Sequence, residues 1–275
     1  MDREMRLKNG MVLQLKNAIK AFFYFIYVKR LELKSHSWKI PYHIGIILDG
    51  NRRFAREQGY MDVTRGHEKG ADKLEEVLTW CQTLGVKIVS IWVFSLDNFK
   101  RDQGEVTSIL TLIEKKMRDL INKDTIHSSG IKIRSMGRID LLPEGLQSAI
   151  HDAEEATKDY DRFVLNIAVA YGGREEIIEA FRKHIYHELE NNKNIRHVIN
   201  DLSVEKIRPH LYTSDLPDPD LIIRTSGEIR LSGFLLWQSA FSEYYFCDTF
   251  WPTFRKVDLL RAVRDYNYRQ RRFGR

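Results

Sequence analysis

The stretch that decides the fold is His-Ile-Gly-Ile-Ile-Leu-Asp-Gly-Asn-Arg-Arg, residues 43–53. Its apolar run from His43 to Leu48 is typical of a buried strand. Asp49 and Gly50 follow at once, and glycine permits a tight turn out of a strand. The segment therefore predicts a strand, a turn and a helix, with polar side chains placed at the carboxyl end of the strand.

Short apolar runs and longer amphipathic segments alternate along the rest of the chain. Further strands are expected over Ile88–Phe94, Ile131–Met136, Val164–Ala170 and Leu221–Ile223. Helices are expected over 67–84, Glu105–His127, Pro143–Thr157, Arg174–Asn191 and 256–270. Strands separated by helices predict a single α/β domain with a central, mostly parallel sheet flanked by helices. In such sheets ligands bind beyond the carboxyl ends of the strands.

Charge is distributed unevenly over the 275 residues. The net charge is +6, yet residues 1–40 hold nine basic and three acidic residues, and residues 255–275 hold eight basic and two acidic. Basic ends on an acidic body indicate an anionic partner, such as a membrane surface, nucleic acid or phosphorylated small molecules. The two cysteines, at 81 and 247, are too few for a disulfide framework or a cysteine-based metal site.

Residues 1–39 are expected to form an N-terminal helical extension ahead of a domain over residues 40–275. The helix is expected over residues 11–33, with an apolar, aromatic-rich centre at residues 21–28 flanked by lysines and Arg30. This centre is too short to span a bilayer, but aromatic residues beside lysines suit the membrane surface. The alternative is a helix packed on the domain or on a partner subunit, and the two can coexist. Without an 18-residue apolar run or the pattern of a signal peptide, we expect a cytoplasmic protein.

The residues after the first strand suit a bound phosphate. The N–H groups at the start of a helix attract an anion, and the guanidinium groups of Arg52 and Arg53 add forked donors. The carboxylate of Asp49 would repel a phosphate unless a divalent cation lay between them, and Mg²⁺ favours one or two carboxylates together with phosphate oxygens. The alternative is an ordinary polar turn in which Asp49 is an N-cap.

Two more loops follow expected strands. Residues 224–232 place two arginines six positions apart around small residues, which predicts a second phosphate site, with Glu243 as a second carboxylate for the metal. Residues 94–101 offer a hydroxyl, an amide and a guanidinium for a polar substrate group. The alternatives are an exposed basic loop and a capped loop. The apolar stripe of the helix Glu105–His127 would either line an apolar cavity beside these loops or pack in the core. With such a cavity, the loops indicate an enzyme acting on two phosphorylated, partly apolar substrates.

Further motifs carry a family resemblance. They are His43–Arg53, Gly66-His67, Phe94-Ser95 through Asn98-Phe99 and Arg101, Ala170–Arg174, Arg224–Ser232, and Phe234–Gln238 with Glu243. With them the chain resembles the cis-prenyltransferases, the undecaprenyl diphosphate synthase and dehydrodolichyl diphosphate synthase family, and its archaeal members above all. The resemblance runs from about Ile40 to Gly274. It implies a parallel-sheet α/β domain with an apolar tunnel for the growing chain.

The family's activity implies a role for each matching residue. It is the Mg²⁺-dependent condensation of isopentenyl diphosphate, in cis, onto geranylgeranyl or farnesyl diphosphate, which gives a long-chain polyprenyl diphosphate, the precursor of a glycosyl carrier lipid. The catalytic residues would be Asp49, Ser95 and Asn98, and the metal ligands Asp49 and Glu243. The allylic diphosphate would be bound by Gly50, Asn51, Arg52, Arg53 and His67. Isopentenyl diphosphate would be bound by Phe99, Arg101, Arg224, Arg230, Ser232, Arg272 and Gly274. The tunnel would be lined by Val93, Ile109, Ile113 and Phe163.

The tail and a few departures complete the comparison with the family. Arg272-Phe273-Gly274 matches the family's terminal R-x-G, which reaches the isopentenyl diphosphate site of the partner subunit. Because the chain has both this motif and Asp49, the resemblance implies a self-sufficient homodimer. A peripheral position on the inner face of the cell membrane is a separate expectation. Val63 stands where the family has an arginine, and Gly233 where it often has Asn or Asp. The alternatives are a non-catalytic subunit or membrane scaffold that keeps the fold, and a nucleic-acid-binding protein. The basic tail lacks the aromatic interleaving of an RNA-binding surface, so no nucleic-acid partner is expected.

Overall fold

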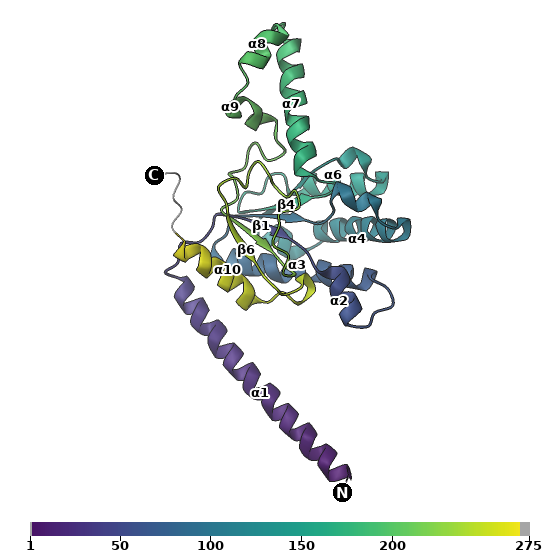
Figure 1. Cartoon of the computed structure of the whole chain (residues 1–275), viewed down its shortest axis with the longest axis vertical. Coiled ribbons are helices and arrows are strands. Elements are labelled where there is room, and N and C mark those ends of the chain that lie inside the picture. The colour runs from purple at the N-terminus through teal and green to yellow at the C-terminus, as the bar shows by residue number, and fades with distance from the viewer. Residues whose placement is uncertain (1, 270–275) are drawn as a thin grey trace.

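A computed structural model describes residues 2–269, with side chains from residue 18 onward (Figure 1). Arg272 and Gly274 therefore lie outside the described residues. A central sheet is surrounded by helices; the first helix, α1 (Asp2–Ser35), leaves this body on one side, and α7 (Gly173–Glu190) projects on another (Figure 1).

Six parallel strands form the sheet. They are β1 (His43–Ile47), β2 (Ile88–Trp92), β3 (Ile131–Met136), β4 (Phe163–Ala168), β5 (Leu221–Arg224) and β6 (Glu243–Phe246). Their order is β3-β4-β2-β1-β5-β6, and every neighbouring pair is parallel. The predicted fold class is confirmed. The short edge strand β6 was not predicted, because its four residues are all only half-buried and carry no clear apolar alternation.

Helices fill the connections between the strands. The remaining α-helices are α2 (Asn51–Glu57), α3 (Thr64–Leu84), α4 (Gln103–Ile121), α5 (Asp124–Ser128), α6 (Glu144–Thr157), α8 (Ile195–Asn200), α9 (Val204–Ile207) and α10 (Lys256–Tyr268). The 3-10 helices are η1 (Leu96–Lys100), η2 (Ile139–Leu141), η3 (Arg208–His210) and η4 (Trp251–Thr253). The helix predicted to run to His127 ends at Ile121, because Lys123 takes an extended conformation between α4 and α5.

Alternate residues of β1 contact different layers. Ile44 and Ile46 are fully buried in the main core, which also contains apolar residues of α3, α4, α6 and α10. Gly45 faces the other way, where a Cβ would lie 2.5 Å from Ile222 Cδ1 and 3.1 Å from the ring of Phe234. Glycine at this position therefore lets Phe234 pack closely against the centre of the sheet.

A buried chain of polar side chains crosses three strands. His43 Nε2 lies 2.8 Å from Ser90 Oγ, and Asn166 Nδ2 donates to the same oxygen at 3.0 Å. His43 Nδ1 lies 2.7 Å from the carbonyl oxygen of Pro217, which fixes the tautomer that donates from Nδ1. Burial lowers the pKa of His43 to about 4, so the ring is neutral at neutral pH.

The first helix packs on the body only near its end. Val28 and Leu31 are buried against Val257 and Leu260 of α10. Farther out, apolar side chains of α1 are 38–64% exposed: Ile19, Phe22, Phe23, Tyr24, Phe25 and Ile26. None of the helices within residues 2–269 combines the length and the apolar character needed to cross a bilayer.

Candidate active site

Polar residues from separate segments meet at one edge of the sheet. Asp49 follows β1, Ser95 follows β2 and Ser226 follows β5, so all three lie at the carboxyl ends of parallel strands. Ser95 also forms an isolated parallel bridge with Tyr171, which follows β4. The expectation that the strand-end loops converge is therefore met, because parallel strands all end at the same edge.

Two arginines contact the carboxylate of Asp49. Arg224 Nη2 donates to Oδ2 at 2.7 Å, and Arg53 Nη2 donates to Oδ1 at 3.3 Å. Burial opposes ionisation of Asp49, but the hydrogen bond and the charge of Arg224, with help from Ser226 and Arg53, lower its pKa below the ordinary value. Asp49 is therefore an anion between two arginines. Arg53 belongs to the first predicted phosphate site and Arg224 to the second.

The turn after β1 needs its glycine. Gly50 has φ 105°, in the left-handed region, and a Cβ there would lie 2.7 Å from Phe250 Cδ1. The adjoining backbone is fixed as well, since Trp251 N–H donates to the Asp49 carbonyl oxygen at 3.0 Å and the indole Nε1 donates to the Gly70 carbonyl oxygen at 2.7 Å. These contacts set the direction in which the Asp49 side chain points.

A largely buried carboxylate that was not predicted from the sequence lies among three of the predicted residues. Glu105 Oε1 is 2.9 Å from Arg101 Nη1, 3.5 Å from Arg52 Nε and 3.7 Å from His67 Nε2, and the Glu105 side chain is 9% exposed. Burial and the charge of Arg101 lower the pKa of His67, while Glu105 raises it. Glu105 appeared in the sequence only as the first residue of an expected helix, so no local pattern marked this role.

Ser95 and Asn98 bind each other. Ser95 Oγ accepts from the Asn98 N–H at 3.2 Å, and Asn98 Oδ1 accepts from the Ser95 N–H at 3.0 Å, which makes a reciprocal cap at the start of η1. The capped loop that was expected as the alternative is therefore present. The side chains of Ser95 and Asn98 also line a polar pocket at this edge of the sheet. Phe99 does not line that pocket; its ring packs edge-on against Phe94 with centroids 5.0 Å apart.

Two adjoining polar pockets collect most of the predicted diphosphate ligands. One is lined by Asp49, Asn51, His67, Ser95, Asn98, Arg101, Arg224 and Ser232, among others. The other is lined by Leu48, Asp49, Gly50, Asn51, Arg52, Arg53, Arg56, His67 and Arg101. They share Asp49, Asn51, His67 and Arg101, so the two predicted phosphate sites lie side by side around one carboxylate.

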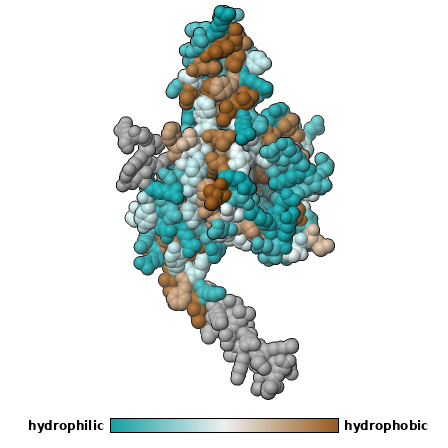
Figure 2. Space-filling model, viewed as in Figure 1, coloured by the Kyte–Doolittle hydropathy of each residue, from teal (hydrophilic) through white to brown (hydrophobic). Residues whose placement is uncertain are grey.

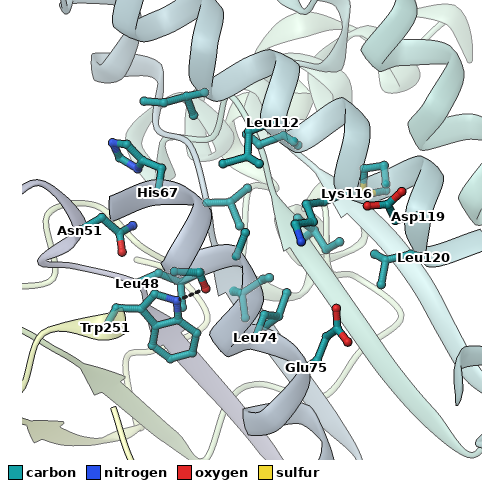
Figure 3. A pocket seen from close by; sticks show the side chains of 18 of the residues that line it. Leu48, Asn51, His67, Leu74, Glu75, Leu112, Lys116, Asp119, Leu120 and Trp251 are labelled. Atoms are coloured by element: carbon teal, nitrogen blue, oxygen red, sulfur yellow. Dashed lines mark hydrogen bonds between the residues drawn. The ribbon is translucent and has the colours of Figure 1, made fainter. Parts of the chain in front are cut away.

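An apolar pocket between α3, α4 and the sheet continues from the polar ones (Figure 3). Asn51 and His67 lie at its polar end, and its walls include the predicted tunnel residues Val93, Ile109 and Ile113. Phe163 was predicted to line the tunnel, but the structure places it elsewhere. It is the first residue of β4, at the amino end of the strand, where it is 2% exposed in the core and does not line this pocket.

Glu243, the second predicted metal ligand, lies far from Asp49 within one chain. It begins β6 and pairs in register with Leu221, which in turn pairs with Ile44, so it lies at the amino edge of the sheet. Asp49 comes five residues after Ile44, about 16 Å farther along the strands at roughly 3.3 Å per residue. Within one chain the two carboxylates cannot share a metal ion; Glu243 instead pairs with Arg269 at 2.9 Å.

The second arginine of the loop is more exposed than the first. Arg224 is 4% exposed, and Arg224 Nη1 donates to Ser232 Oγ at 2.8 Å and also bonds the carbonyl oxygen of Arg230. The Arg230 side chain is 61% exposed and pairs with Glu228, and it does not line the polar pockets. Arg224 therefore belongs to the buried site and Arg230 to its rim.

The donor set fits a single magnesium ion carried with a diphosphate. Among the described residues no three His, Cys, Asp or Glu side chains form a metal-binding group, and Asp49 is the one carboxylate among the described residues that line the two polar pockets. Four buried polar atoms there have no hydrogen-bond partner: Asn51 Oδ1, Arg52 Nε, His67 Nε2 and Arg224 Nε. Unsatisfied buried donors and acceptors are costly unless a ligand completes them. One carboxylate plus phosphate oxygens is a usual way to hold Mg²⁺.

The fold and the site define a class: α/β proteins in which an arginine-lined polar site adjoins an apolar pocket. Residues 47–274 match the family model described as "Putative undecaprenyl diphosphate synthase", and the chain belongs to this family.

Relatives and solved structures agree with this assignment. The chain is 50% identical, over 92% of its length and 91% of the relative's, to a protein of Methanopyrus kandleri named tritrans,polycis-undecaprenyl-diphosphate synthase (geranylgeranyl-diphosphate specific). It is 49% identical, over 88% of each chain, to an isoprenyl transferase of Deinococcus radiodurans. Among solved structures it is similar to lavandulyl diphosphate synthase from Lavandula x intermedia in complex with dimethylallyl diphosphate, with a TM-score of 0.80 and 37% identity over 86% of this chain and 99% of that one.

Proposed function

We propose that this chain is a Mg²⁺-dependent cis-polyprenyl diphosphate synthase that adds isopentenyl diphosphate units to an allylic diphosphate. The observation that carries the proposal is the junction of the two kinds of pocket, where Asp49 and its arginines lie beside the apolar walls of Val93 and Ile109. A diphosphate head and a hydrocarbon tail fit this arrangement. Geranylgeranyl diphosphate is the favoured primer, because the Methanopyrus kandleri relative is named as specific for it, and farnesyl diphosphate is the alternative.

Different residues would bind the two diphosphates. Arg52, Arg53 and His67 would bind the allylic diphosphate, while Arg224 and Ser232 would bind that of isopentenyl diphosphate, with Asp49 between them. Bound Mg²⁺ would neutralise charge on the leaving diphosphate. The positive donors already face the position where that charge develops, so little reorganisation is needed at the moment of reaction.

Incorporation of labelled isopentenyl diphosphate tests the proposal. Purified full-length chain is incubated with Mg²⁺ or with EDTA, and with geranylgeranyl or farnesyl diphosphate, and the butanol-extractable label is resolved by chain length. Label that needs both Mg²⁺ and a primer is the expected result. A folded chain that incorporates no label with either primer, in the presence of detergent, contradicts the proposal and favours a non-catalytic subunit.

We also propose that the enzyme is a homodimer. Exposed apolar side chains gather on the projecting part of the chain that contains α7, α8 and α9 (Figure 2): Ile178, Tyr186, Ile195 and Ile199 are 42–65% exposed. Apolar residues grouped in this way support contact with another protein surface. Light scattering should give twice the chain mass, and Tyr186→Glu with Ile199→Glu should shift the protein toward the monomer.

A peripheral position on the membrane is the last part of the proposal. The exposed aromatic residues of α1 lie beside Lys20, Lys29 and Arg30, which suits the surface of an anionic bilayer. Cys81 and Cys247 are free and buried, which is consistent with a cytoplasmic protein. Flotation with vesicles containing phosphatidylglycerol should carry the protein upward, and replacing Phe22, Phe23 and Phe25 by serine should abolish flotation while incorporation persists.

A further inference from the structure

A basic pocket lies at the place where α1 leaves the body of the molecule, beside α10 (Figure 1). Its charged lining residues are Arg30 and Lys34 of α1 and Arg264 and Asp265 of α10. The pocket has a volume of about 290 Å³, whereas one water molecule needs only roughly 10–15 Å³ of such space. It can therefore hold a group of several heavy atoms.

The charges in this pocket are not balanced. Asp265 is the one acid among its described lining residues, and Asp265 Oδ1 already accepts from Arg264 Nη2 at 2.9 Å. Arg30 and Lys34 are exposed, and neither forms an ion pair within the part of the chain that the structure describes. Three positive charges thus face one negative charge, a net charge of +2. Cations held together in this way attract an anion, and phosphate oxygens suit both guanidinium and ammonium groups.

Tyr27 extends the positive field toward the outer part of α1. Arg264 Nη1 lies 3.5 Å from the Tyr27 hydroxyl oxygen, and the Arg261 guanidinium lies over the ring, 5.3 Å from its centroid. Arg261, with help from Arg264, lowers the pKa of the Tyr27 hydroxyl. The pocket therefore offers an anion a hydroxyl group as well as cations.

The face of α1 that carries the pocket residues also carries exposed apolar side chains. Helix positions i, i+4, i+7 and i+11 share one face, and here they hold Phe23, Tyr27, Arg30 and Lys34. Phe23 is 64% exposed, and Ile19, one turn farther out, is 47% exposed. Phe23 precedes Arg30 by seven residues, about 10 Å along the helix. An apolar stripe therefore leads directly into a basic pocket, which is the arrangement that fits a molecule with a hydrocarbon tail and an anionic head.

We propose that the pocket between α1 and α10 binds the phosphate headgroup of an anionic membrane lipid, whose acyl chains lie along the stripe of Ile19 and Phe23. The inference rests on the membrane position proposed above and names the site that recognises the lipid. Arg269 follows the pocket residue Tyr268 and pairs with Glu243 at the amino edge of the sheet. The lipid therefore binds away from Asp49, which lies at the carboxyl edge, and leaves the diphosphate site open.

Binding of short-chain lipids to the full-length chain tests the inference without a bilayer. Isothermal titration calorimetry in about 0.15 M salt, where exposed charges are screened beyond about 8 Å, compares three ligands. Dihexanoyl phosphatidic acid has both tail and phosphate, dihexanoyl phosphatidylcholine has the tail without the net charge, and inorganic phosphate has the charge without the tail. Phosphatidic acid should bind more tightly than either of the others. Equal binding of inorganic phosphate would overturn the lipid assignment in favour of a free anion, and equal binding of phosphatidylcholine would overturn the role of the phosphate.

A charge-matched pair of variants locates the site. Arg30→Gln with Lys34→Gln should weaken phosphatidic acid binding about 30-fold, with a thermal melt like that of the wild type, because both side chains are exposed and form no ion pair with a described residue. Lys20→Gln with Lys29→Gln removes the same charge from α1, but neither lysine lines the pocket, so wild-type affinity is expected. An equal loss in both variants would overturn the pocket in favour of a general basic surface. Unchanged binding in the Arg30 and Lys34 variant would also overturn it, because the lipid would then occupy another site, such as that of the substrates.

The lipid site and the synthase activity fail separately. Lipid binding that depends on Arg30 and Lys34, in a chain that incorporates no labelled isopentenyl diphosphate, would remove the proposed activity and retain the pocket. Incorporation by a chain that does not bind phosphatidic acid would retain the activity and overturn the pocket.

Discussion

Replacing Glu105 by glutamine removes the negative charge that two arginines and His67 share. Glu105 accepts a 2.9 Å hydrogen bond from Arg101, with Arg52 and His67 slightly farther away, and its side chain is 9% exposed. A hydrogen bond to a charged group contributes roughly 1.5–3 kcal/mol, and glutamine keeps an oxygen acceptor but not the charge, so we expect a loss of roughly 1–2 kcal/mol. This corresponds to a fall of about 5- to 30-fold in kcat/KM for the primer.

Steady-state kinetics with the allylic primer, together with a thermal melt, measures the effect. The pH profile should change as well, because the charge of Glu105 raises the pKa of His67 and its removal should move that ionisation to lower pH. Glu114→Gln is the matched control, since Glu114 pairs with Arg118 at 3.0 Å on the same helix but 31% exposed. A Glu105→Gln enzyme with wild-type kcat/KM, or an equal loss in Glu114→Gln, would refute the reasoning.

Three further predictions concern the Gly50 turn, the Asp49 carboxylate and the buried His43. Gly50→Ala places a Cβ 2.7 Å from the ring of Phe250 at φ 105°, so thermal melts should show a loss of roughly 1–3 kcal/mol; an unchanged melt would contradict the strain. Asp49→Asn should lower kcat by a factor on the order of 10² or more while circular dichroism stays native; near-wild-type turnover would remove Asp49 from the mechanism. The pKa of His43 is about 4 in the folded chain and about 6.5 in the unfolded chain. Between pH 4 and pH 6.5, therefore, only the unfolded chain binds a proton at His43. Stability is therefore full above pH 6.5 and falls toward pH 4, by about 3 kcal/mol in all; urea unfolding should show this slope, and His43→Gln should reduce it.

Local sequence patterns were sufficient to predict the strands and helices that have one clear apolar stripe. The segment that contains β1 and the Gly50 turn was predicted correctly, because the apolar run, the glycine and the polar residues follow one another in the chain. The edge strand β6 was not predicted, because its residues are half-buried and only their pairing with β5 makes them a strand. Propensity at such a short edge is decided by its neighbours.

Burial and distance separate residues that look equivalent in the sequence. Arg224 and Arg230 lie in one loop, but Arg224 is buried against Asp49 and Arg230 is exposed beside Glu228. Glu243 looked like a second metal ligand, yet the parallel register places it at the opposite edge of the sheet from Asp49. Residue type alone cannot show this difference.

By itself the sequence determined the α/β class and predicted that Asp49, Arg53 and Arg224 lie at strand ends, because these depend on apolar periodicity and on residues next to a strand. Only the tertiary structure decided that Glu105 joins the site, since its three neighbours Arg52, His67 and Arg101 come from α2, α3 and the loop after η1. It also decided that basic residues of α1 and α10 share one pocket. Such contacts form between segments far apart in the chain, where no local pattern records which side chains will meet.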